Sequence, residues 1–230
     1  MPLPARIDAV LCDVGGPIYT DDNFLWAVRR AVDEVRAGHG MGPAETRDVL
    51  RVYDEVRQAQ RGSIRTTLAR ELLGDESLRR ELAEPLSRYW IHPPGTAYAD
   101  AIELFRALHG RVRVAVVANQ ERATVDALTR DGFGDLIDVW GISAIVGHEK
   151  PSPEFFAWAL RECGTTADHA VHIGNRLDTD VRPAKALGLG TIFVTRGEAP
   201  PHPTTEQRAE ADVTVPDLTG VAQLILERAT

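Results

Sequence analysis

The stretch that decides the fold is Ile7-Asp8-Ala9-Val10-Leu11-Cys12-Asp13-Val14-Gly15-Gly16-Pro17-Ile18. An apolar run of strand length leads into a glycine turn, so the pattern predicts a buried strand that delivers Asp13 into the turn. In open α/β sheets, ligands bind beside the carboxyl ends of the strands. Gly15 and Gly16 carry no side chains, so a ligand can approach the main chain closely there. An acidic residue after a strand is also a common turn former or helix cap, so a functional interpretation depends on the rest of the chain.

Length and composition narrow the class of protein. The chain has 230 residues, 43% of them hydrophobic and 26% charged, which is typical of a globular domain with room for an inserted subdomain. The longest apolar runs are strand-sized, and the net charge of −8 comes without a basic run, so neither a membrane nor a nucleic acid is an expected partner. The first residues lack the features of a signal peptide, and the two cysteines make no disulfide framework. We expect a cytoplasmic monomer or homodimer.

The periodicity of apolar residues changes along the chain. After the first strand, residues 20–94 follow the helical period and contain no strand candidate. From residue 95 onward, predicted strands and helices alternate, which is typical of a parallel sheet with helices on both faces. The later predicted strands cover residues 112–117, 142–146, 170–173, 191–194 and 212–215. The pattern therefore predicts an α/β core made of residues 1–19 and 95–230, with an all-helical insertion at 20–94.

Polar residues follow three of the later predicted strands. Asn119 and Gln120 come after the second strand, Lys150 after the third, and Asn175 and Asp180 after the fourth. The carboxyl ends of parallel strands lie at one edge of a sheet. The side chains that we expect to meet in one crevice are Asp13, Asn119, Lys150, Asn175 and Asp180.

These stretches resemble the motifs of the haloacid dehalogenase-like (HAD) hydrolase superfamily in order and spacing. In this sequence the four motifs read Asp13-Val14-Gly15-Gly16-Pro17, Ala118-Asn119, Lys150-Pro151-Ser152-Pro153, and Gly174-Asn175 through Asp180. The resemblance covers the whole chain, because the family carries a helical cap after its first strand. It implies a Rossmann-like parallel-sheet core with residues 20–94 as the cap subdomain.

The resemblance also implies a reaction. Such enzymes mostly transfer a phosphoryl group from a small phosphorylated metabolite to an aspartate and then hydrolyse the aspartyl phosphate. By resemblance, Asp13 is the nucleophile, and Lys150 and Mg²⁺ offset its repulsion from the phosphate. The implied metal-binding residues are Asp13, Gly15 through its carbonyl, Asn175, and Asp180, which acts through water or by orienting Lys150. The residues expected to contact substrate are Gly15, Gly16, Asn119 and Gln120, together with Arg61 and Arg65 from the cap.

Three positions depart from the family pattern. Gly15 replaces an aspartate that acts as general acid and base in most phosphatases of the family. Ala118 replaces a hydroxyl that binds the phosphoryl group, so either Asn119 or Gln120 takes over that contact or the contact is lost. Asn175 replaces a metal-binding carboxylate. The candidates for a substitute acid are Tyr19, Asp21 and Asp22. Two alternatives stay open: a metal-independent dehalogenase-like hydrolase, and a catalytically impaired binding or regulatory protein.

Overall fold

The computed structural model describes residues 2–229 and contains a six-stranded sheet in the order β3-β2-β1-β4-β5-β6. Every pair of neighbouring strands runs parallel. The strands are β1 Ala9–Cys12, β2 Arg113–Ala118, β3 Val139–Ile142, β4 Ala170–Gly174, β5 Gly190–Val194 and β6 Val213–Val215. The chain adds strands first on one side of β1 and then on the other, so the point where the strand order reverses lies beside β1. The predicted α/β fold with a parallel sheet is confirmed.

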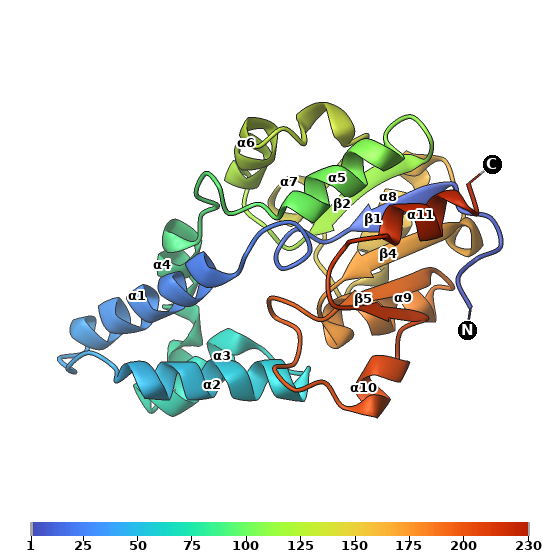
Figure 1. The fold of residues 1–230 in the computed structure, drawn as a ribbon. Helices are drawn as coiled ribbons and strands as arrows, with labels where there is room; N and C mark the ends of the chain where they lie inside the picture. Colours follow the sequence, from blue (N-terminus) through green and yellow to red (C-terminus); the bar gives the residue numbers. More distant parts are fainter. Residues whose placement is uncertain (1, 230) are drawn as a thin grey trace. The chain divides into compact units, whose positions relative to one another are not determined.

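The chain divides into two compact units, which are described separately (Figure 1). The sheet unit comprises Met1–Thr20, Pro93–Ala199 and Pro203–Thr230, and the helical unit comprises Asp21–His92 and Pro200–His202. The helices of the sheet unit are α5 Ala99–Leu108, α6 Ala123–Arg130, α7 Ser143–Val146, α8 Pro153–Cys163, α9 Arg182–Ala186, α10 Thr205–Ala209 and α11 Val221–Leu226. Short 3₁₀ or π-helical turns cover Gly134–Leu136, Ala167–His169 and Leu177–Val181.

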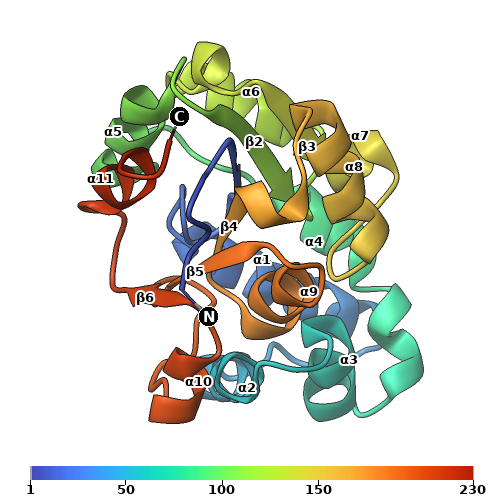
Figure 2. The ribbon, with the colours of Figure 1, turned by 90° about the vertical axis from the view of Figure 1, so that its right-hand side faces the viewer.

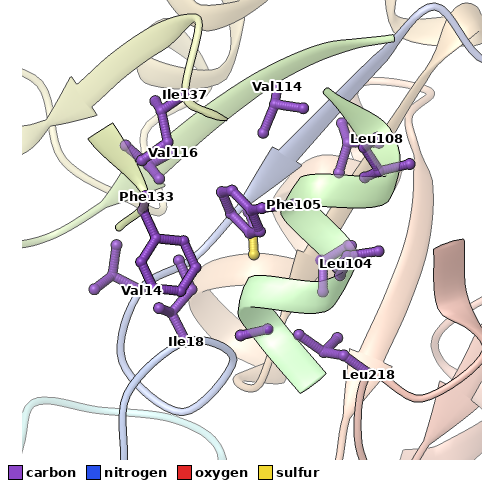
Figure 3. Packing of buried hydrophobic residues seen from close by; sticks show 14 of the residues in the cluster. Val14, Ile18, Leu104, Phe105, Leu108, Val114, Val116, Phe133, Ile137 and Leu218 are labelled. Carbon is purple, nitrogen blue, oxygen red and sulfur yellow. The ribbon is translucent and has the colours of Figure 1, made fainter. Parts of the chain in front are cut away.

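Helices cover both faces of the sheet. Successive residues of a strand point to opposite faces, and in β1 all of them are apolar and buried. Val10 and Cys12 pack in a cluster with residues of α5, α6 and α11, whereas Ala9 and Leu11 pack with residues of α8 and α9. Figure 2 shows α5 and α11 on one side of the sheet and α8 on the other. On the first face, the Phe105 ring lies between α5 and the sheet (Figure 3).

The helical unit has an apolar core of its own. Its helices are α1 Asp22–Gly38, α2 Thr46–Ala59, α3 Ile64–Leu68 and α4 Ala83–Tyr89, with a π-helical turn at Ala69–Leu73 and a 3₁₀ turn at Glu76–Arg80. Apolar residues recur at the helical period, so each longer helix buries one face. The core residues of these elements include Val28, Val32, Val52, Leu68, Leu72, Leu82 and Leu86. The assignment of residues 20–94 as a cap domain, with the stated boundaries, stays a prediction.

One of the predicted strands is wrong in detail. The strand predicted at 142–146 is displaced, because β3 covers Val139–Ile142 and Ser143–Val146 form α7. Short apolar runs do not distinguish a strand from a buried helical turn, and here Gly147, at φ +78°, ends the helix. Within residues 2–229, every helix is too short or too polar to cross a membrane.

Candidate active site

The site is organised around a buried ammonium group that lies between two carboxylates. Asp13 directly follows β1, and its main-chain N–H donates to the Ile173 carbonyl of β4 at 2.8 Å. Lys150 Nζ lies 2.8 Å from Asp13 Oδ1 and 2.5 Å from Asp180 Oδ1. Lys150 is 4% exposed and Asp180 is fully buried. A buried charge is tolerated only when it is paired and hydrogen-bonded, so these three side chains form one interdependent unit at the carboxyl end of the central strand.

Asp180 is held by several hydrogen-bond donors. Its Oδ2 accepts bonds from the main-chain N–H groups of Asn175, at 3.2 Å, and Arg176, at 3.0 Å. Its Oδ1 lies 3.1 Å from His172 Nε2 in the buried strand β4. Gly174 is required beside it, because a Cβ on Gly174 would lie 2.4 Å from Asp180 Cβ. The arrangement favours the role in which Asp180 orients Lys150, and its expected part in metal binding stays a prediction.

The three charged groups perturb one another. Burial raises the pKa of Asp13 to about 6, although the Lys150 ammonium opposes the shift. Burial also disfavours ionised Asp180, but Lys150 and the hydrogen bond from His172 outweigh it and hold the pKa of Asp180 below its ordinary value. Burial alone would lower the pKa of Lys150, whereas its two carboxylate partners raise it further. Lys150 therefore stays protonated, and Asp13 is ionised in most molecules at pH 7.

Two amide side chains that we expected to contact substrate are engaged inside the sheet unit. Asn119 Oδ1 accepts the Lys150 main-chain N–H at 2.7 Å, and Asn119 Nδ2 donates to the Lys150 carbonyl at 2.8 Å. Gln120 is buried, and its Oε1 accepts the Thr124 hydroxyl at 3.2 Å. Asn119 thus fixes the main chain of Lys150. Replacement of the hydroxyl missing at Ala118 by either amide stays a prediction.

Asn175 and the glycine turn after Asp13 lie against each other. Asn175 Nδ2 donates to the Arg196 carbonyl at 3.1 Å, which assigns the amide orientation because a carbonyl can only accept. Gly16 has φ +82°, and a Cβ there would lie 1.9 Å from Asn175 Nδ2. Within residues 2–229, no N–H or O–H group donates a hydrogen bond to the carbonyl of Gly15 or to Asn175 Oδ1. Both oxygens are therefore available to a cation.

The donor chemistry fits Mg²⁺. Asp13 contributes a carboxylate, Gly15 a carbonyl and Asn175 an amide oxygen, and Mg²⁺ prefers oxygen ligands while keeping several waters. No group of three or more His, Cys, Asp or Glu residues with metal-binding geometry occurs in the part of the chain that the structure describes.

The remaining candidates are the two cap arginines expected to contact substrate and the residues considered as a substitute acid. Arg61 and Arg65 are exposed residues of the helical unit; Arg61 lies three residues before α3, and Arg65 lies in the first turn of α3. Their expected contact with substrate stays a prediction. Tyr19 is fully buried, and its hydroxyl donates to Asp131 Oδ2 at 2.9 Å. Burial and this hydrogen bond raise the pKa of Tyr19, which makes its hydroxyl a weaker acid. The role of Tyr19, Asp21 or Asp22 as a substitute acid stays a prediction.

Sequence reasoning missed Arg196, which follows β5. Its guanidinium Nε donates to the Gly16 carbonyl at 2.9 Å, and Nη2 donates to the Pro17 carbonyl at 2.6 Å. The signal was present, because Arg196 is a polar residue at the same edge of the sheet as the other candidates. Applied to β5, the strand-end criterion would have selected it.

A family model described as haloacid dehalogenase-like hydrolase matches residues 7–188. The matched range contains all four motif stretches and the site formed by Asp13, Lys150 and Asp180. The chain belongs to the haloacid dehalogenase-like hydrolase family. The resemblance inferred from the four motifs is thereby confirmed.

Individual relatives agree with this family assignment. A glyceraldehyde 3-phosphate phosphatase of Methanopyrus kandleri is 39% identical over 72 residues, which is 31% of this chain and 30% of the relative. A phosphoserine phosphatase of Thermus thermophilus is 30% identical over 177 residues, or 71% of this chain and 66% of the relative. The chain spans between 30% and 42% of the length of the first curated relatives that it matches.

Solved structures share the fold of the haloacid dehalogenase-like hydrolases. The HAD hydrolase YfnB of Bacillus subtilis, solved with bound magnesium, aligns with a TM-score of 0.66 at 18% identity. The alignment covers 96% of this chain and 99% of YfnB. At this identity, the likeness concerns the fold.

Proposed function

We propose that this protein is a Mg²⁺-dependent phosphatase that hydrolyses a small phosphorylated metabolite through an aspartyl phosphate at Asp13. The observation that carries the proposal is the buried Lys150 ammonium 2.8 Å from Asp13 Oδ1, at the carboxyl end of the central strand. An ammonium at this position offsets the repulsion between a carboxylate nucleophile and a phosphate. The names of the phosphatase relatives support the reaction class. We also propose that residues 20–94 are the family's cap and that residues 1–19 and 95–230 are its core.

The proposed reaction has two steps, transfer of the phosphoryl group to Asp13 and hydrolysis of the aspartyl phosphate. The Asp13 carboxylate attacks phosphorus, the bond from phosphorus to the leaving oxygen breaks, and that oxygen takes a proton from solvent because Gly15 supplies no acid. Water then attacks phosphorus and gives a proton to solvent, the bond from phosphorus to Asp13 breaks, and inorganic phosphate leaves. Lys150 remains protonated throughout, and Asn119 and Asp180 hold it in place. Mg²⁺, held by Asp13, the Gly15 carbonyl and Asn175 Oδ1, would supply Lewis-acid stabilisation of phosphoryl oxygens.

Phosphate release from a panel of aryl, acyl and alkyl phosphates tests the proposal. We expect release in Mg²⁺, loss of release in EDTA, and loss of release in Asp13→Asn, because a neutral amide is not a nucleophile. Asp126→Asn is the matched control, since Asp126 is an exposed residue of α6. Activity of Asp13→Asn close to that of the unmodified protein would show that the nucleophile is misassigned.

A 2-haloacid, added to this panel of phosphates, separates the alternative functions. Release of halide from a 2-haloacid in EDTA, without phosphate release, would support the metal-independent dehalogenase. Binding of Mg²⁺ without turnover of either substrate class would support a binding or regulatory protein.

A further inference from the structure

We infer that Arg196 is a positioning residue for the active site, holding the turn after Asp13 with its side chain and Asn175 with its main chain. The consequence for catalysis rests on the proposed function. The effect of Arg196 on the turn and on Asn175 does not depend on the proposed function, because every contact that carries it lies within the sheet unit.

The Arg196 side chain fixes two successive carbonyls of the turn. Nε donates to Gly16 O at 2.9 Å and Nη2 donates to Pro17 O at 2.6 Å. A guanidinium is planar and presents its donors in a rigid fork. Two carbonyls that bind the same fork are therefore fixed relative to each other. The turn begins only two residues after Asp13 and includes the Gly15–Gly16 peptide, so its geometry decides where the Gly15 carbonyl lies.

The guanidinium is itself anchored on its other sides. Nη1 and Nη2 donate to the two carboxylate oxygens of Asp100 at 2.7 and 3.1 Å. The guanidinium carbon lies 3.8 Å from the centre of the Tyr98 ring. Asp100 is fixed in turn, because its Oδ2 accepts the Leu218 main-chain N–H at 2.8 Å. The Arg196 and Asp100 side chains are 14% and 16% exposed, so this pair is shielded from solvent, unlike a typical surface ion pair.

The main chain of Arg196 reaches the second half of the site. Its carbonyl accepts Asn175 Nδ2 at 3.1 Å, which turns Asn175 Oδ1 away from the carbonyl. One residue thus sets both neutral oxygens assigned to the metal, those of Gly15 and Asn175. Neutral ligands attract a divalent cation less strongly than carboxylates do. Affinity at this site therefore depends on how well these oxygens are placed, which is the contribution that residues behind the ligands make to metal sites.

The test compares Arg196→Lys with Arg182→Lys. Lysine keeps the charge but loses the fork. Arg182 is a matched control because it makes a two-point bond to Glu210, at 2.6 and 2.9 Å, in the same unit. In metal-free protein, we expect amide hydrogen exchange of residues 14–19 to accelerate about tenfold or more in Arg196→Lys. We also expect the calorimetric affinity for Mg²⁺ to fall by about 10–100-fold. In the control, both quantities should match those of the unmodified protein.

Asp100→Asn provides a second route if Arg196→Lys does not fold. It leaves the carbonyl contacts of Arg196 in place and weakens their anchor, so the same changes are expected in smaller degree. The inference would be overturned if the Arg196 and Asp100 variants left unchanged both the amide hydrogen exchange of residues 14–19 and the affinity for Mg²⁺. If exchange and affinity respond while the unmodified protein releases no phosphate from any substrate, the inference holds and the proposed function fails. In an active enzyme, we expect kcat to fall more than KM rises.

Discussion

Replacement of Gly16 by alanine should damage the active site more than the fold. Gly16 has φ +82°, a conformation that costs a residue with a Cβ about 1–2 kcal/mol. The new Cβ would also lie 1.9 Å from Asn175 Nδ2 and 2.6 Å from Asn175 Cγ, so the amide has to move. That movement breaks the bond to the Arg196 carbonyl, which is worth about 0.5–1.5 kcal/mol. The sum is a loss of about 1.5–3.5 kcal/mol in the free energy of unfolding.

Gly220→Ala separates the cost of the backbone conformation from the cost of displacing the Asn175 amide. Gly220 has φ +78°, and a Cβ there meets nothing within 4 Å, so this variant carries only the backbone cost of about 1–2 kcal/mol. The assays are urea unfolding in EDTA and calorimetric titration with Mg²⁺. We expect Mg²⁺ affinity to fall about tenfold or more in Gly16→Ala and to stay unchanged in Gly220→Ala. Equal stability losses and equal Mg²⁺ affinities in the two variants would refute the reasoning.

Three further predictions concern charge. Asn175→Asp should tighten Mg²⁺ binding, because an added carboxylate attracts a divalent cation at close range; an unchanged half-saturation point in a Mg²⁺ titration would count against Asn175 as a ligand. General acid–base catalysis contributes about 10²–10⁴-fold to the rate in other enzymes, and Gly15 cannot provide it. Because p-nitrophenolate leaves without gaining a proton, p-nitrophenyl phosphate should react faster than alkyl phosphates. Gly15→Asp should flatten this dependence on leaving-group pKa, and a shallow dependence without the substitution would refute the argument. Asp212, whose side chain is 2% exposed, accepts two bonds from Thr191 and pairs with Lys185 at 3.3 Å. Burial opposes its ionisation, but the hydrogen bonds that its carboxylate accepts, those from Thr191 and Lys185 among them, together hold the pKa of Asp212 below its ordinary value. Its stabilisation is present above the unfolded pKa of about 3.9 and is lost as the pH falls through the folded pKa. Asp212→Asn should therefore cost about 1.5–3 kcal/mol at pH 7 and less at pH 3 in thermal unfolding, and equal costs would contradict this prediction.

The sheet could be predicted because its inner strands are buried on both faces. Such strands are apolar runs between turn residues, as in β1 and in residues 114–118 of β2, and in β4 the buried His172 alone interrupts the apolar run. The position of β3 could not be predicted in the same way. Apolar residues continue from Val139 to Val146 with few interruptions, and the division between strand and helix depends on pairing with β2.

The site could be predicted at the level of main-chain position, since strand ends fix which residues share an edge. Side-chain partners could not. Asn119 binds the main chain of Lys150, and Arg196 binds carbonyls 179 and 180 residues earlier in the chain. Such bonds depend on the assembled fold, whereas local sequence shows only that a polar group is available to make them.

The central place of β1 has a consequence for protein synthesis. Its hydrogen-bonded neighbours are Arg113–Val116 in β2 and Ala170–Ile173 in β4. At about 5–20 residues per second, the ribosome completes these partners roughly 5–30 seconds after β1. Meanwhile Ala9–Cys12, apolar on both faces, offers two unpaired edges to other nascent chains. Substitutions that slow the pairing of β4 should therefore reduce the yield of properly folded chains released from the ribosome, even where the finished enzyme tolerates them.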